Sequence, residues 1–230
     1  MDHLEKHCLI KESQHGFVRN KSCLTNLLVF MDEVTNYLDS GYPVDVMYLD
    51  FQKAFDKVPH QRLLMKLAAH GLGGDILQWI ANWLSNRKQR VVLNGEHSGW
   101  RDVLSGVPQG SVLGPILFVI YIYIDIDDSV NCKIPKFADD TKIYQTIYSE
   151  EDICKLQTDF YNLVAWSEDW QMLFNVDKCK VMHRGYNNRH FDYLMSSSTL
   201  ESVNEEKVTC TERTADFCPW HRPGVSMANG

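Results

Sequence analysis

A short apolar run that ends in a carboxylate restricts the fold more than any other feature of the sequence. Residues 44–51 are rich in β-branched and aromatic side chains and predict a buried strand with Asp50 near its end. A carboxylate in that position is costly unless it is solvated, paired or bound to metal. The pair Asp139-Asp140 stands in a predicted tight turn between two short strands. Either feature alone is typical of an ordinary turn, but together they predict carboxylates that converge from two rigid elements.

The remaining periodicity predicts a mixture of helices and strands. Apolar residues at helical spacing predict helices at about 22–39, 61–69, 75–84, 116–124 and 151–170. Short strands are expected at 133–137 and 142–147, with a turn and strand within 172–182. Asn94-Gly95 indicates a hairpin between its flanking segments. Because strands and helices do not alternate strictly, we expect an α+β fold, with a small antiparallel sheet and helices on one side of it.

Composition places the 230 residues among ordinary soluble globular proteins, with 44% hydrophobic residues. The longest apolar run, 116–124, is too short to span a membrane, and the first residues do not resemble a signal peptide. Seven cysteines without a Cys-x-x-Cys pair argue against a disulfide framework. We therefore expect an intracellular protein, in the nucleus or the cytoplasm, with no targeting signal and no membrane partner.

The three carboxylates suit magnesium chemistry. Mg²⁺ prefers hard oxygen ligands and often combines one or two carboxylates with substrate phosphates. Two such ions can activate a primer 3′-hydroxyl and stabilise a leaving pyrophosphate. The net charge of −7 is unfavourable for binding nucleic acid, although the acidity lies mainly in the second half of the chain. Arg87, Lys88 and Arg90 form the one concentrated basic patch, which is either a contact to the phosphate backbone or a solvated face.

Five segments, in this order, make the interpretation specific. They occupy residues 14–23, 49–56, 105–115, 137–140 and 173–180. Residues 49–56 resemble the first palm motif of reverse transcriptases, and 105–115 the second. Phe137-Ala138-Asp139-Asp140 resembles the Tyr/Phe-x-Asp-Asp box of the same enzymes. The chain resembles the reverse transcriptase domain of a non-LTR (LINE-like) retrotransposon of the jockey type over about residues 9–207.

The resemblance implies an organisation and a reaction. It implies a polymerase palm with partial fingers, truncated at both ends. The expected parts are a partial fingers segment (1–43), a palm (44–190), the start of a palm-to-thumb connection (191–207) and an aberrant, disordered tail (208–230). The family reaction is RNA-directed DNA synthesis by two-metal nucleotidyl transfer. Its partners are an RNA template, a DNA primer and a dNTP, with no clear protein partner.

The resemblance also implies roles for the metal-binding residues. Asp50 and Asp139 are expected to be the main ligands of two Mg²⁺ ions, with Mn²⁺ as a possible substitute. Asp140 is expected to support them, and the backbone carbonyl of Phe51 to lie nearby.

Further residues are expected around the nucleotide, each with a simpler alternative. Phe55 is placed against the sugar, where its ring would exclude a 2′-hydroxyl, unless it is a core residue. Gln109 and Gly110 would line the pocket for nucleotide and template, unless they form an ordinary turn. Lys178 would lie near the incoming phosphates, unless it is a solvated surface lysine.

Three departures from the family pattern leave an alternative open. The fingers motif expected before Gln14 is absent, the segment 119–125 is one residue longer than in relatives, and the resemblance stops after Lys207. Frameshift, misjoining or decay of the element would explain the end, as would a new extension. The alternative function is therefore a catalytically inactive remnant that at most binds nucleic acid. An RNA-dependent RNA polymerase is disfavoured by Phe55, because RNA synthesis must admit the 2′-hydroxyl.

Overall fold

The computed structural model describes residues 11, 13–206 and 225–229, and it divides the chain into two compact units. Unit 1 comprises Met1–Gln52 and Ile122–Glu212, and unit 2 comprises Lys53–Tyr121 and Arg213–Gly230. The first segment of unit 2, Lys53–Tyr121, is therefore inserted, in sequence, between the two segments of unit 1. The two units are described separately below.

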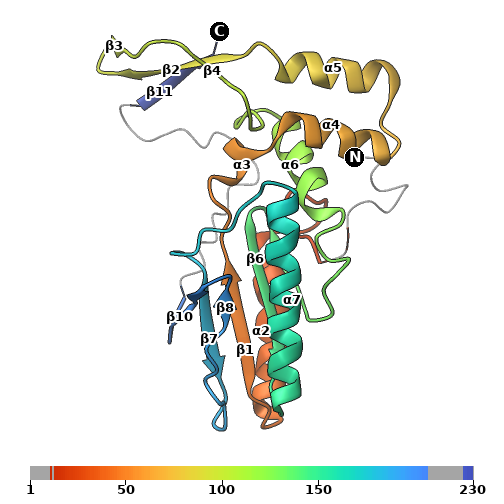
Figure 1. The fold of residues 1–230 in the computed structure, drawn as a ribbon, viewed down its shortest axis with the longest axis vertical. Coiled ribbons are helices and arrows are strands. Elements are labelled where there is room, and N and C mark those ends of the chain that lie inside the picture. Colours follow the sequence, from red (N-terminus) through yellow and green to blue (C-terminus); the bar gives the residue numbers. More distant parts are fainter. Residues whose placement is uncertain (1–10, 12, 207–224, 230) are drawn as a thin grey trace. The chain divides into compact units, whose positions relative to one another are not determined.

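Unit 1 is built on a five-stranded sheet (Figure 1). Its strands are β1 (Val44–Leu49), β5 (Lys136–Phe137), β6 (Asp140–Thr146), β7 (Lys180–Arg184) and β10 (Glu201–Ser202), in the order β10-β7-β1-β6-β5. The central strand β1 pairs antiparallel with both β6 and β7. The short strand β10 pairs parallel with β7. The prediction of a purely antiparallel sheet is therefore wrong at this edge. A separate small hairpin joins β8 (Leu194–Met195) and β9 (Ser198–Thr199).

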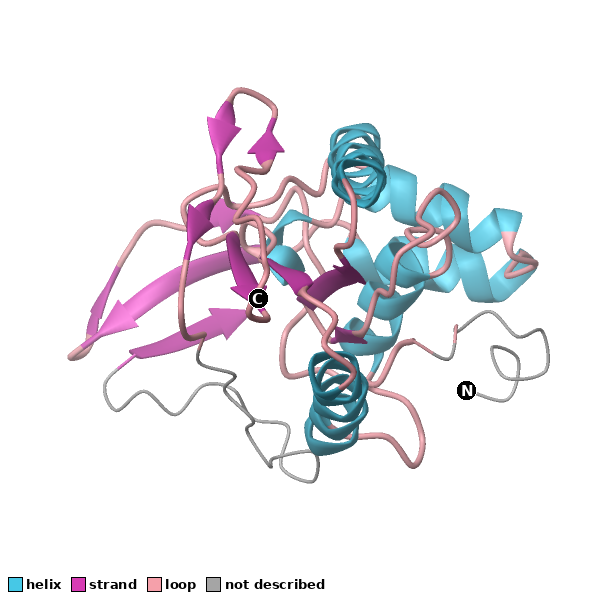
Figure 2. Ribbon diagram, turned by 90° about the horizontal axis from the view of Figure 1, so that it is seen from below, coloured by secondary structure: helices cyan, strands magenta, loops and turns pink. Residues whose placement is uncertain are grey.

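Two long helices pack on the sheet, namely α2 (Cys23–Asp39) and α7 (Glu150–Asp169). Each begins with a capping box, formed by Ser22 with Thr25 in α2 and by Ser149 with Asp152 in α7. Figure 2 views unit 1 along both helices and shows them on opposite faces of the sheet. The prediction of helices on one side is therefore wrong, because α2 and α7 each bury their own apolar stripe against a different face.

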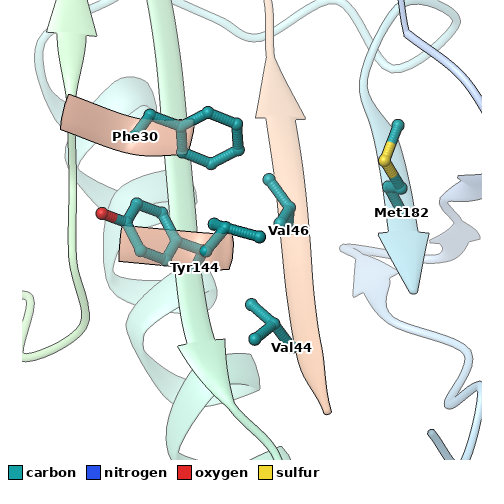
Figure 3. Close-up of a cluster of buried hydrophobic side chains, with 6 residues drawn as sticks. Phe30, Val44, Val46, Tyr144 and Met182 are labelled. Atoms are coloured by element: carbon teal, nitrogen blue, oxygen red, sulfur yellow. The ribbon is translucent and has the colours of Figure 1, made fainter. Parts of the chain in front are cut away.

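The core between α2 and the sheet explains why β1 reads as a buried strand. Val46 lies opposite Tyr144 of β6 and Met182 of β7, so one face carries a continuous apolar row across three strands. Figure 3 shows this row with Val44, and with Phe30 of α2 above it. The rings of Phe30 and Tyr144 meet edge to face, with centroids 5.2 Å apart. The packing fixes the register of β1 and hence the position of the residue that follows it.

Unit 2 contains most of the predicted helices of the first half. It comprises α3 (Ala54–Lys57), α4 (His60–Ala69), α5 (Gly74–Leu84), β2 (Lys88–Leu93), β3 (Glu96–His97), β4 (Arg101–Asp102), most of α6 (Leu113–Tyr123) and β11 (Val225–Asn229). Asn94 and Gly95 have φ of 51° and 84° and connect β2 to β3, as the hairpin prediction required.

A strand near the end of the chain lies within the segment 208–230, which the sequence predicted to be disordered. Val225–Asn229 forms β11, which pairs antiparallel with β2, whereas the sequence predicted no element there. The other residues of that tail, 208–224 and 230, lie outside the described residues. Helix α6 is strongly apolar, but none of the helices in the described ranges is both long and apolar enough to cross a bilayer.

Candidate active site

The register of the central strands brings the three carboxylates to one end of the sheet in unit 1. β1 ends at Leu49, which lies opposite Thr141 near the start of β6. Because the strands are antiparallel, the residue after β1 and the first residue of β6 lie at the same end. Asp50 follows β1 directly, and Asp140 begins β6. The turn before β6 supplies Asp139, so two separate elements supply the site.

Loss of solvation, with repulsion from neighbouring carboxylates, raises the pKa of Asp139 and that of Asp140. The Asp139 side chain still contacts solvent, yet its pKa is raised to about 6, first by partial loss of solvation and then by the negative charges of Asp140 and Asp50. The pKa of Asp140 is also raised, mainly by loss of solvation; Lys142 opposes this rise and Asp50 adds to it. A bound cation would remove this repulsion.

Lys178 already places a positive charge beside Asp50. Its Nζ lies 3.2 Å from both carboxylate oxygens of Asp50, and both side chains are partly exposed. The ammonium group also lowers the pKa of Asp139 and that of Asp140. The backbone of the same loop is tied to the end of β1, since the N–H of Asn175 donates to the carbonyl of Asp50 at 2.7 Å. Lys178 is thus held near all three carboxylates.

A charged pocket of about 340 Å³ opens at this end of unit 1. Its charged lining consists of Asp50, Asp140, Asp177, Glu206, Lys142, Lys178 and Lys180. Four of these residues were not predicted from the sequence, namely Asp177, Glu206, Lys142 and Lys180. One of them, Lys142, could have been found, because it lies two positions after Asp140 on a strand and so shares its face. Burial lowers the pKa of Lys142, whose ammonium lies 5.8 Å from the centroid of the Phe30 ring.

The other residues predicted around the nucleotide do not share this pocket. The side chain of Phe51 is buried in unit 1 and stacks on Phe174, with centroids 4.5 Å apart. Phe55 belongs to unit 2, where it stacks on Phe118 at 4.2 Å. Gln109 also belongs to unit 2, where its Nε2 donates to Oδ1 of Asp56 at 3.4 Å.

The basic patch and the glycine-rich loop are also features of unit 2. Arg87 and Gln109 line a second pocket of about 590 Å³, while Gly110 is exposed with φ of 78°. Lys88 forms an exposed ion pair with Asp102, with Nζ 3.8 Å from Oδ1. The guanidinium of Arg90 lies over an aromatic ring, 4.7 Å from the centroid of Trp100. The patch is therefore partly engaged within the protein rather than fully free for phosphate.

The donor chemistry of the site fits a divalent cation. Within the described ranges, no group of three or more His, Cys, Asp or Glu side chains is arranged to hold a metal ion. Such a cage is not required for Mg²⁺, which usually retains waters and combines one or two carboxylates with substrate phosphates. The negative charges of Asp140 and Asp50 raise the pKa of Asp139, and a divalent cation bound beside these carboxylates would offset that repulsion.

The fold and the carboxylates together define the palm of a nucleic-acid polymerase. Telomerase from Candida albicans, solved with a fragment of telomeric RNA, has a similar fold with a TM-score of 0.50. The alignment covers 78% of this chain and 34% of the telomerase chain, at 13% sequence identity. The chain belongs to the reverse transcriptase (RNA-dependent DNA polymerase) family, whose model matches residues 1–210.

Several similar curated proteins come from transposable elements. The probable RNA-directed DNA polymerase from transposon X-element of Drosophila melanogaster is 27% identical over 76% of this chain and 20% of its own length. The RNA-directed DNA polymerase from mobile element jockey of the same species is 29% identical over 57% of this chain and 15% of its own length. The chain thus spans no more than about a fifth of these relatives. The recognition of a non-LTR reverse transcriptase domain is confirmed, and this family uses divalent metal ions.

Proposed function

We propose that this chain carries the polymerising palm of an RNA-directed DNA polymerase of a non-LTR retrotransposon. It would extend the 3′-hydroxyl of a DNA primer along an RNA template, using dNTPs and releasing pyrophosphate. One observation carries the proposal: Asp50 and the Asp139-Asp140 turn meet at one end of the sheet in a chain of the reverse transcriptase family. The raised pKa of Asp139 supports it, because perturbed carboxylates cluster at functional sites.

The chain's own residues would divide the work as follows. Asp50 and Asp139 would be the principal ligands of two Mg²⁺ ions, or Mn²⁺ in their place, and Asp140 would support them. When bound, these ions would supply positive charge to the attacking 3′-oxygen and to the leaving pyrophosphate. Lys178, which forms an ion pair with Asp50, would neutralise part of the charge of the triphosphate. Lys142 adds a second positive charge to the same pocket.

Residues of unit 2 would determine which nucleotides the enzyme accepts. We assign to Phe55 the exclusion of the 2′-hydroxyl, and to Gln109 and Gly110 the lining of the nucleotide and template pocket. The ring of Phe55 is half-buried and stacked, which would give it the fixed orientation that steric exclusion needs. Arg87, Lys88 and Arg90 would contact the phosphate backbone of template or primer, independently of its sequence.

Primer extension on poly(rA)/oligo(dT) tests this function, using Asp139→Asn as the site variant. The amide keeps the shape of the side chain and removes the charge that would hold the cation. We expect Mg²⁺-dependent extension by the wild type and a loss on the order of 100-fold or more in Asp139→Asn. Asp192→Asn is the matched control, because Asp192 is also exposed but belongs to the segment between β7 and β8, and not to the end of β1 or the turn before β6; it should keep wild-type activity.

Failure of the wild type to extend the primer would refute the proposal. The binding of labelled template–primer, followed by fluorescence polarisation, would then decide whether the chain is a remnant that only binds nucleic acid. Equal extension by wild type and Asp139→Asn would show that the activity does not come from this site.

A further inference from the structure

The segment at residues 13–16 runs beside β5 and extends the sheet of unit 1. The N–H of Lys136 donates to the carbonyl of Ser13 at 3.0 Å, and the N–H of His15 donates to the carbonyl of Lys136 at 2.9 Å. These bonds form a parallel bridge between Gln14 and Lys136. A segment from the start of the chain is thereby fixed two residues before the turn that supplies Asp139.

This pairing presses Gly16 against the backbone of Ala138. A Cβ atom at position 16 would lie 2.3 Å from the backbone nitrogen of Ala138 and 2.9 Å from its Cα. Both are backbone atoms, so they can yield only if the turn itself moves. The side chain of Gln14 is fully buried, and its Oε1 accepts the N–H of Gly16 at 2.5 Å. Gly16 is therefore held in this close approach, which only glycine allows.

Ala138 is held from its other side as well. Its φ of 54° is left-handed, a conformation that is sterically unfavourable for a residue with a Cβ. Such a residue keeps that conformation only where its surroundings impose it. The hydroxyl of Tyr123, a fully buried side chain, donates to the carbonyl of Ala138 and lies 3.4 Å from Oγ1 of Thr141. Gly16 and Tyr123 thus clamp the peptide groups on either side of Ala138.

We propose that Gly16 and Tyr123 are positioning residues for polymerisation, an inference that rests on the proposed function. By fixing the backbone at Ala138, they set the direction in which the carboxylates of Asp139 and Asp140 leave the turn. To relieve a contact of 2.3 Å, the turn would have to move by about 1 Å, and a displacement of that size can cost on the order of 100-fold in rate. Neither residue touches substrate.

The first test replaces Gly16 with alanine and separates kcat from KM. In Gly16→Ala, kcat for primer extension should fall on the order of 100-fold, while KM for dNTP changes less than about threefold. The matched control is Gly99→Ala, because a Cβ at Gly99 meets open space and no positive φ is needed there; it should behave as wild type. Unchanged kcat in a folded Gly16→Ala protein would overturn the proposal.

Tyr123→Phe provides a variant that keeps the buried ring and removes only the hydroxyl. It should lower kcat on the order of 10-fold with KM for dNTP nearly unchanged. Since Gly16 and Tyr123 act on the two peptide groups that flank one residue, Ala138, the double variant should lose less than the product of the two single losses. If Gly16→Ala does not fold, the Tyr123→Phe result decides: wild-type kcat would overturn the proposal.

Hydrogen exchange gives a readout that does not depend on activity. Peptides covering 137–141 should exchange faster in both variants, whereas those of α7 should keep wild-type protection. Unchanged exchange at 137–141 in both variants would overturn the clamp. If the wild type fails to polymerise while exchange at 137–141 responds as expected, the proposed function fails and the clamp on the turn stands.

Discussion

Tyr193→Phe removes one oxygen atom from a buried polar cluster and tests how firmly β1 is held. The cluster surrounds Asp45, which is fully buried on β1. Its carboxylate accepts hydrogen bonds from the Tyr193 hydroxyl at 2.6 Å, from Nδ1 of His183 at 2.7 Å and from Nδ2 of Asn188 at 2.7 Å. These donors lie on β7 and on the chain that follows it, so the cluster ties that segment to β1, the strand that Asp50 directly follows.

The expected loss follows from the chemistry of that bond. A hydrogen bond to a charged group contributes about 1.5–3 kcal/mol net. Two donors remain on the Asp45 carboxylate in the variant, so its desolvation stays largely compensated, and we expect a loss of about 2 kcal/mol. Burial and the Asp45 charge raise the pKa of Tyr193, so its hydroxyl stays protonated and donates throughout the working pH range. For a chain of this length the loss corresponds to a drop in Tm of about 4–8 °C.

Urea and thermal unfolding, followed by far-UV circular dichroism, measure this loss. The matched control is Tyr186→Phe, because Tyr186 is fully exposed in the same region and its stability effect should stay within about 0.5 kcal/mol. A Tyr193→Phe protein that melts with the control, within a degree, would refute the assignment of stability to this cluster. A loss confined to Tyr193→Phe would show that the cluster holds the segment after β7 on β1.

Three further predictions concern the site and its support. Mg²⁺ or Mn²⁺ should raise Tm more at pH 7.5 than at pH 5, because the pKa of Asp139 is raised from 3.8 to about 6 and the protonated carboxyl group binds no cation. Without a cation, the same pKa shift should make the native state less stable as the pH rises from about 4 to about 6. Asp139→Asn should remove the pH difference, and an equal gain at both pH values in the wild type would contradict the assignment. Phe55→Ala should raise ribonucleotide incorporation by an active protein, measured with rNTP and dNTP in competition; unchanged sugar selectivity would refute the steric role. Lys136→Met should cost about 1–3 kcal/mol in urea unfolding, since it removes the ion pair from the partly buried carboxylate of Asp127, which keeps the hydrogen bond from the Ser13 hydroxyl; a loss below about 0.5 kcal/mol would show that this ion pair does not stabilise the fold.

Elements with strong local patterns could be predicted from the sequence. The helix expected at 22–39 is α2 (Cys23–Asp39), and that expected at 151–170 is α7 (Glu150–Asp169), because each carries a 3.6-residue apolar repeat. The strand expected at 44–51 is β1, shortened to Val44–Leu49. Edge strands were missed: β10 and β11 are short and exist through pairing with distant partners, which periodicity cannot show.

Some residues of the candidate site could also be predicted from the sequence, and others could not. Asp50 and Asp139-Asp140 could be selected because carboxylates in strand-end and turn positions are visible locally, and family motifs surround them. The contact of Gly16 with Ala138 could not be selected, since it joins residues from opposite halves of the chain. The sequence motif at 14–17 marked this segment, but its position beside β5 appears only in three dimensions. The roles predicted for individual site residues stay predictions until the variants are measured.

The pairing of β1 with β6 has a consequence for how the protein folds. The two strands are neighbours in the sheet, yet the whole of Lys53–Tyr121 lies between them in sequence. Their pairing closes a loop of about ninety residues, whose entropic cost grows only with the logarithm of its length. Such non-local contacts nevertheless slow folding, because the chain loses conformational entropy on closing the loop before the new contacts can stabilise it. During synthesis Asp50 would leave the ribosome long before its partner strand exists, so the carboxylates can come together only after Lys53–Tyr121 has been made.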